Sequence, residues 1–316
     1  FLLCLFFMLL PIHSLAQSET IEITGEATGR FHLHNGQEVK YITFHKGQQF
    51  NAQKQDNQWL IQVGNAQVII GNRFAKAISK SLPVSRTTNK VEAVTTKPVA
   101  IYPTKNKKEK PFAMMAQNMR ISSGGIKGNY YEIIVGGKKG YVHKNAVEQD
   151  NGVPILIYHH LVENQENSIH KNNVSVYDID LFTQQADYLS TQKFYTLSLK
   201  DLDAWMKHQQ ALPAKAVILT FDDATLSAYE LVYPLLKKYR MFATTFVIGD
   251  RVSDKTPAFD MNKNQFAGFN ELREMQGVFE LEHHTYGLHT FNSITKKSSL
   301  PYAPNNALHY DFTHMN

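Results

Sequence analysis

Residues 215–239 read KAVILTFDDATLSAYELVYPLLKKY, in which an apolar run ends in two adjacent carboxylates, Asp222 and Asp223. The run predicts a buried strand over 215–221, and the pattern after it predicts a helix over 225–239 that Pro234 kinks or splits into two pieces. Two like charges side by side need a reason, because each disfavours the ionised form of the other.

The surrounding sequence alternates strands and helices. Buried strands are predicted at VPILIY (153–158), FATTFVIG (242–249) and VFELEHH (278–284). Two amphipathic helices are predicted between them, one with Asp180 as its N-cap and one that begins with a capping box of Ser198 and Asp201. Apolar strands that alternate with helices indicate an α/β domain with a parallel sheet, either open or closed into a barrel.

Acids and imidazoles follow three of these strands. They are Asp222 and Asp223, His159 and His160, and His283 and His284 with His289 five residues later. Because the carboxyl ends of parallel strands meet at one edge of the sheet, we expect these side chains to gather there. Two histidines and one carboxylate form a metal site with open positions, and a bound ion makes the like-charge pair tolerable. The second Asp is then free to take a proton from the attacking water.

The Asp pair and each histidine, taken alone, have simpler explanations than a metal site. Two consecutive Asp residues after a strand often form a turn or a helix N-cap, and a single His at a strand end is often a hydrogen-bonded surface residue. The combination at three strand ends favours the metal site.

At these residues the chain resembles the polysaccharide deacetylases of the NodB-homology family (carbohydrate esterase family 4). LTFDDA (219–224) resembles the first motif of that family, T-F-D-D-G, and HTYGLH (284–289) resembles the second. The spacing of the two histidines and the strand ILIYHHL resemble the branch that de-N-acetylates poly-N-acetylglucosamine in biofilms. The resemblance covers about residues 153–292 and implies a distorted (β/α) barrel.

The resemblance also implies roles for individual residues. Asp222 would be the general base, and Asp223, His284 and His289 would bind a divalent metal. Zinc is the first expectation, although the same ligands accept cobalt, nickel or iron. Thr285 would support the site beside its ligand neighbour. His159 and His160 would either line the pocket or serve packing, and both alternatives stay open.

Two features depart from the family pattern. Ala224 stands where the family usually has Gly, which puts the turn in question because Gly allows positive φ. The family motifs expected after the second one, including the His that acts as general acid, do not occur before Asn316. The tail SLPYAPNNALHYDFTHMN (299–316) is interpreted as carrying little information. We therefore expect an incomplete deacetylase domain over 150–316 that is weak or inactive as a catalyst.

The N-terminal half predicts two small all-β domains, over 20–80 and 99–149, separated by a Ser-, Thr- and Pro-rich linker at 81–98. NQWLIQVG and NYYEIIVGG look like copies about 70 residues apart. The second copy resembles a bacterial SH3-like (SH3b) module, and the first is a poorer match. Such modules imply contact with cell-wall peptides or glycans, with a mere spacer as the alternative.

Composition and the N-terminal segment limit the possible partners and the cellular location. The net charge of +5 comes without a long basic block, so a nucleic-acid partner is not expected. The single cysteine, Cys4, excludes a disulfide framework. Residues 1–16 resemble a partial secretory signal peptide and are too short to span a bilayer. We expect an extracellular protein, either secreted or held at the cell surface or in the periplasm.

Three functions follow. The first is a secreted, metal-dependent N-deacetylase that acts on poly-N-acetylglucosamine, peptidoglycan or a chitin-like oligomer, with O-acetylated xylan as a further substrate of the same chemistry. The second is a non-catalytic cell-wall or glycan-binding protein with a degenerate deacetylase domain. The third takes the Asp and His residues as incidental. In each case the chain is multidomain, with two SH3-like barrels before the α/β domain.

Overall fold

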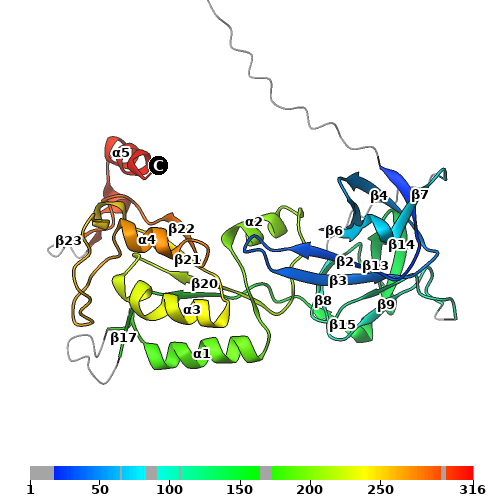
Figure 1. Ribbon diagram of the computed structural model, residues 1–316, viewed down its shortest axis with the longest axis horizontal. Coiled ribbons are helices and arrows are strands. Elements are labelled where there is room, and N and C mark those ends of the chain that lie inside the picture. Colours follow the sequence, from blue (N-terminus) through cyan, green and yellow to red (C-terminus); the bar gives the residue numbers. More distant parts are fainter. Residues whose placement is uncertain are drawn as a thin grey trace, which may run out of the picture. The chain divides into compact units, whose positions relative to one another are not determined.

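A computed structural model of the chain describes residues 18–64, 66–80, 82, 91–106, 108–163, 173–292 and 297–315. These residues form two compact units, one built of strands and one that mixes strands with helices (Figure 1). The main boundary between them falls after Asp150, and residues 32–37 group with the second unit and residues 208–211 with the first. Within the described ranges, no helix has the length and apolar character to cross a bilayer. The signal-type segment 1–16 lies outside these ranges.

The N-terminal unit is all-β, as predicted. Its strands are β1 (Glu19–Ile23), β2 (Ala27–His32), β3 (Glu38–Phe44), β4 (Gln49–Gln55), β5 (Gln58–Val63), β6 (Ala66–Gly71), β7 (Ala75–Ile78), β8 (Val91–Thr95), β9 (Val99–Ile101), β10 (Ala113–Met115), β11 (Arg120–Ser123), β12 (Ile126–Lys127), β13 (Tyr130–Val135), β14 (Lys138–His143) and β15 (Val147–Gln149). Single turns of 3₁₀ helix, η1 (Asn72–Phe74) and η2 (Lys144–Ala146), precede β7 and β15.

The proposed internal copies share an order of elements. In the first copy the β5–β6 hairpin leads into η1 and β7, and in the second the β13–β14 hairpin leads into η2 and β15. The two copies are joined by pairing, because β3 pairs with β10 and β5 pairs with β13 within one 12-stranded sheet. The strand pairing therefore does not divide this unit into two separate barrels.

The linker prediction is wrong at its C-terminal end. Residues 91–95 form β8, which lies between β11 and β15 in a second, antiparallel sheet. The segment VEAVT is rich in β-branched residues, and three of its five side chains are buried. Its stability comes from partners far along the chain, which local composition does not reveal. Most of the remaining predicted linker, residues 83–90, lies outside the described ranges.

The C-terminal unit contains a parallel sheet in the order β16 (Ile155–Tyr158), β20 (Ala216–Phe221), β21 (Ala243–Val247) and β22 (Phe279–His283). The short strand β19 (Tyr195–Thr196) also runs parallel to β20, and β17 (His160–Val162) pairs in parallel with β18 (Val176–Asp178). The α/β class is thus as predicted. The described strands form an open sheet, and closure into a barrel remains an expectation.

Helices and turns alternate with these strands. They are α1 (Ile179–Thr191), α2 (Leu199–Met206), the π-helical turn η3 (Ala228–Val232), α3 (Tyr233–Tyr239), η4 (Gly249–Arg251), α4 (Phe269–Met275), η5 (Leu300–Tyr302) and α5 (Asn305–His314), with a hairpin of β23 (Phe291–Asn292) and β24 (Lys297–Ser298) before η5. The helix predicted over 225–239 is divided, as Pro234 indicated, into η3 and α3.

The helix starts test two capping predictions. Ser198 and Asp201 form the predicted capping box of α2. The N-cap of α1 is Asp178 and not Asp180, because the Asp178 carboxylate accepts the backbone N–H groups of Asp180 and Leu181. Two Asp residues of equal capping strength lie two positions apart here, so composition alone did not choose between them.

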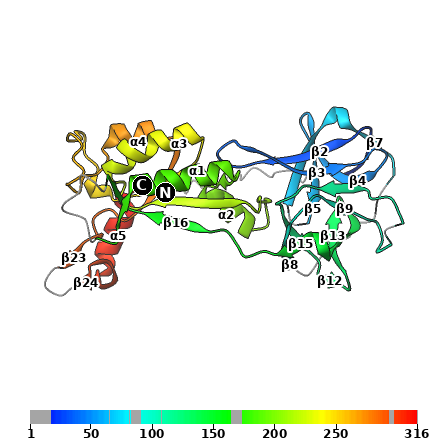
Figure 2. The same cartoon turned by 90° about the horizontal axis from the view of Figure 1, so that it is seen from below.

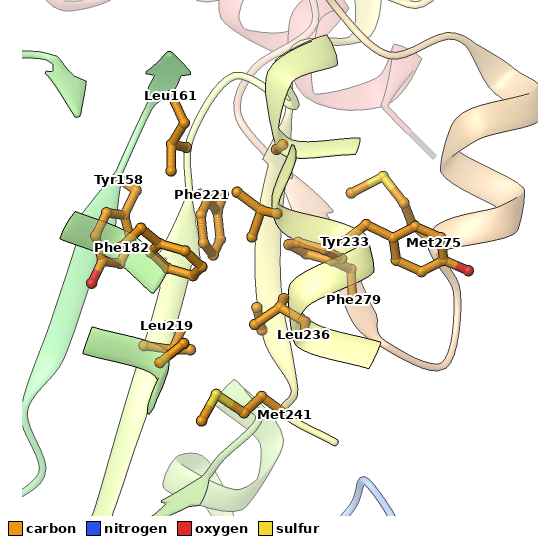
Figure 3. Packing of buried hydrophobic residues seen from close by; sticks show 14 of the residues in the cluster. Tyr158, Leu161, Phe182, Leu219, Phe221, Tyr233, Leu236, Met241, Met275 and Phe279 are labelled. Atoms are coloured by element: carbon orange, nitrogen blue, oxygen red, sulfur yellow. The ribbon is translucent and has the colours of Figure 1, made fainter. Parts of the chain in front are cut away.

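The core of this unit lies between the sheet and three helices. Helices α1, α3 and α4 lie along one side of strands β16 and β20 (Figure 2). Phe221 is fully buried, and its ring contacts Tyr158, Phe182 and Phe279 at centroid distances of 5.1–5.7 Å (Figure 3). Because Phe221 immediately precedes the carboxylate pair, this packing anchors the end of β20 from which both acids project.

Candidate metal centre

The two carboxylates lie in a strained turn at the end of β20. The backbone N–H of Asp222 donates to the carbonyl oxygen of Tyr158 at 2.9 Å, which continues the pairing with β16 by one residue. Asp223 and Ala224 then adopt positive φ angles of 70° and 50°. This reversal turns the chain out of the strand at the sheet edge, and it places Ala224 in the left-handed conformation that Gly adopts without strain.

The histidines come from the end of β22. The backbone N–H of His284 donates to the carbonyl oxygen of Val247 at 2.8 Å, so the first histidine is tied to the neighbouring strand β21. Thr285 follows with a positive φ of 67°, which is costly for a β-branched residue. The chain then loops back, and the rings of His284 and His289 lie with centroids 4.5 Å apart.

Asp223, His284 and His289 converge on one point. Asp223 Oδ1 lies 3.5 Å from His284 Nε2 and 3.3 Å from His289 Nε2, and the three ligand atoms lie within 4.8 Å of one another. Asp223 Oδ1 is buried and accepts no hydrogen bond from any residue that the structure describes. Ligands of a tetrahedral ion, each at about 2.0–2.1 Å from it, are about 3.3 Å apart. The spacing and the unsatisfied oxygen therefore fit a divalent ion.

Asp222 stands beside this triad and not in it. Its Oδ2 lies 3.5 Å from His159 Nε2, and its side chain is 19% exposed. His159 is itself 36% exposed. The two adjacent Asp residues thus lie near different histidines, because Asp223 lies near His284 and His289 of the triad and Asp222 lies near His159, which is outside it. Asp222 has the access to water that a proton acceptor requires.

His160 has different surroundings. It is 7% exposed, and its ring nitrogens contact Ser227 Oγ at 3.0 Å and the carbonyl oxygen of Met261 at 3.2 Å. Ser227 Oγ also accepts the backbone N–H of Leu161 at 3.0 Å. Of the two alternatives for this histidine, packing is the one that these contacts favour. Thr285 lies next to His284, and its buried Oγ1 is without a hydrogen-bond partner in the described ranges.

Burial lowers the pKa of His284 below its usual value. The carboxylates of Asp222 and Asp223 act in the opposite direction, while His289 and His159 add to the lowering. A histidine kept neutral in this way presents a lone pair at Nε2 at neutral pH, which is the form that binds metal.

Replacement of Ala224 by Val is expected to destabilise the C-terminal unit by about 2 kcal/mol. Ala224 has φ of 50° and is 2% exposed, so a β-branched side chain meets both backbone strain and a filled core. Urea denaturation measures the change in the free energy of unfolding. Ala224→Gly is the control, since Gly adopts positive φ without strain. Equal stability of the Val variant and the parent would contradict the strained turn.

Sequence reasoning missed one residue of this region. The tail after residue 299, interpreted as carrying little information, contains helix α5, and Asp311 of this helix is 2% exposed. Its carboxylate accepts the backbone N–H groups of Tyr286, Gly287 and Leu288. A single Asp in a mostly polar helix gives no signal from which such distant contacts can be predicted.

Part of the C-terminal unit is similar to known proteins. Residues 209–302 match the polysaccharide deacetylase family. The poly-β-1,6-N-acetyl-D-glucosamine N-deacetylase of Staphylococcus aureus strain N315 is 32% identical over 117 residues, which are 36% of this chain and 39% of that protein. Residues 209–302 of the C-terminal unit are therefore similar to a polysaccharide deacetylase domain. Within that class they are similar to the poly-β-1,6-N-acetylglucosamine deacetylases, and the chain spans under half the length of these curated relatives.

Two solved structures are similar to part of this chain. IcaB from Ammonifex degensii is 25% identical, with a TM-score of 0.42 over 52% of this chain and 65% of that one. Streptococcus pyogenes deacetylase PplD, solved in complex with acetate, is 27% identical, with a TM-score of 0.36 over 48% of this chain and 66% of that one.

Proposed function

We propose that the protein is a metal-dependent polysaccharide N-deacetylase that hydrolyses N-acetyl groups of a β-linked N-acetylglucosamine polymer. The observation that carries this proposal is the triad of Asp223, His284 and His289 around an unsatisfied carboxylate oxygen, with Asp222 beside it. The family match and the named activity of the Staphylococcus aureus relative support the reaction type.

The triad and Asp222 have separate roles in the proposed reaction. Asp223, His284 and His289 would hold a divalent ion, with zinc as the first expectation. Such an ion, when bound, activates water and polarises an acetyl carbonyl. The carboxylate of Asp222 takes the proton from the attacking water, and His159 Nε2 lies 3.5 Å from that carboxylate. As the amide C–N bond breaks, the nitrogen takes up the proton that Asp222 removed from water, so that acetate is released and the sugar carries a free amine.

The proposal also includes the polymer that serves as substrate and the cellular location of the enzyme. We take poly-β-1,6-N-acetylglucosamine as the first substrate, because the Staphylococcus aureus relatives that are 32% identical over 117 residues are named for it. The N-terminal β unit would keep the enzyme at the cell wall, in the manner of SH3-like modules. The apolar segment 1–16 in the sequence supports work outside the cytoplasm.

The test is acetate release by the full-length protein with zinc added. The substrates are oligomers of β-1,6-N-acetylglucosamine, peptidoglycan fragments, chitin oligomers and acetylated xylan. We expect the fastest release from the β-1,6-linked oligomers. Faster release from peptidoglycan would reassign the substrate. No release from any of the four, with zinc bound, would contradict the proposal and select a glycan-binding protein with a degenerate site.

A further inference from the structure

Helix α5 contacts the loop that joins the two histidines of the triad. Asp311 Oδ1 accepts the backbone N–H of Tyr286 at 2.8 Å, and Oδ2 accepts those of Gly287 and Leu288 at 2.7 Å each. These three residues occupy the middle of the five-residue step from His284 to His289. One buried carboxylate therefore binds most of the connection between two of the three ligands.

The same loop is held from its other side. The backbone N–H groups of Gly249 and Asp250 donate to the carbonyl oxygens of Thr285 and Tyr286 at 3.1 and 2.8 Å. The Tyr286 ring packs against Tyr310 and His314 of α5, with centroids 6.2 and 5.6 Å away. The turn after β21 thus fixes the carbonyl groups of the loop, and α5 fixes its N–H groups.

Three consecutive N–H groups that converge on one carboxylate form charge-assisted hydrogen bonds, which are stronger than neutral ones. Without that acceptor, the three donors lose their partner and the loop loses the constraint on its N–H side. The positions of His284 Nε2 and His289 Nε2 depend on this loop, and metal affinity depends on how well ligands are held before the ion arrives.

We propose that Asp311 is a positioning residue of the metal centre. It fixes residues 286–288 and thereby sets the relative placement of His284 and His289 that the ion requires. This inference rests on the proposed function only in that the triad binds a divalent ion. It gives the segment after residue 304 a role in the site, although none of its residues belongs to the triad.

Two substitutions at Asp311 weaken its hydrogen bonds to residues 286–288 by different amounts. Asp311→Asn keeps one acceptor oxygen but turns an NH₂ group toward backbone donors, and Asp311→Ala removes both oxygens. We expect the zinc dissociation constant to rise about 10-fold for Asn and about 100-fold for Ala. The visible absorption bands of the Co²⁺-loaded protein should change in the same order, since they report ligand geometry. The control is Asn306→Ala, an exposed position on the same helix.

Folded variants whose zinc affinity and Co²⁺ spectrum equal those of the parent would overturn the inference. Hydrogen exchange in the metal-free parent tests, without any variant, whether residues 286–288 are held before the ion binds. We expect the amides of Tyr286, Gly287 and Leu288 to be protected before metal is added, and exchange at the rate of an unfolded chain would overturn the proposal. A parent that binds no zinc would overturn the proposed function as well, whereas zinc binding indifferent to Asp311 overturns this inference alone.

Discussion

Replacement of Asp222 by Asn is expected to reduce acetate release by a factor on the order of 10² to 10⁴ while zinc stays bound. Asp222 is the carboxylate that lies outside the triad, with Oδ2 3.5 Å from His159 Nε2 and 19% of its side chain exposed. An amide has nearly the same shape but does not accept a proton from water. The substitution therefore removes the base and leaves the ligands of the ion in place.

Two measurements on the same preparation separate these effects. Acetate release gives the rate, and zinc titration gives the affinity, which should stay within a few-fold of the parent value. Asp187→Asn is the matched control, because Asp187 is an exposed residue of α1 on the face away from the core. A rate for the Asp222 variant within a few-fold of the parent would remove Asp222 from the catalytic role.

Replacement of His289 by Ala is expected to weaken zinc binding by at least about 10²-fold and to reduce acetate release to the level of the metal-free protein. His289 Nε2 lies 3.3 Å from Asp223 Oδ1, the shorter of the two ligand separations. Its side chain is 49% exposed, so the loss of the ring should cost the fold little. Isothermal titration with zinc measures the change.

The control for this substitution is His283→Ala. His283 is the exposed last residue of β22, one position before the first ligand, and it is not part of the triad. Its removal should leave zinc affinity unchanged. If both substitutions weakened zinc binding equally, the ion would not be held by the specific set of Asp223, His284 and His289.

The sequence predicted those parts of the site that lie directly after apolar strands. An apolar strand that ends at Phe221 and another that ends at His283 are parallel, so the acids and histidines after them meet at one edge. The capping box of Ser198 and Asp201 was predicted for a similar reason, because its signal lies within four residues. Such features can be predicted because the residues that cause them lie close together in the sequence.

Other features depended on partners far along the chain. His159 and His160 are neighbours in sequence, and the tertiary contacts of Ser227 and Met261 decide that the second one is buried. Strand β8 looked like a linker because its pairing partners, β11 and β15, lie beyond the segment itself. Asp311 acts on a loop 23–25 residues away, so no spacing rule identified it.

The most direct test of a metal-dependent deacetylase is a cycle of zinc removal and return on one preparation of the full-length protein. Acetate release from a β-1,6-N-acetylglucosamine oligomer would be measured before chelation, after it, and after zinc is added back. We expect release to be lost on chelation and regained when one zinc ion per chain is bound. Release that continues unchanged in the metal-free protein would contradict a metal-dependent mechanism.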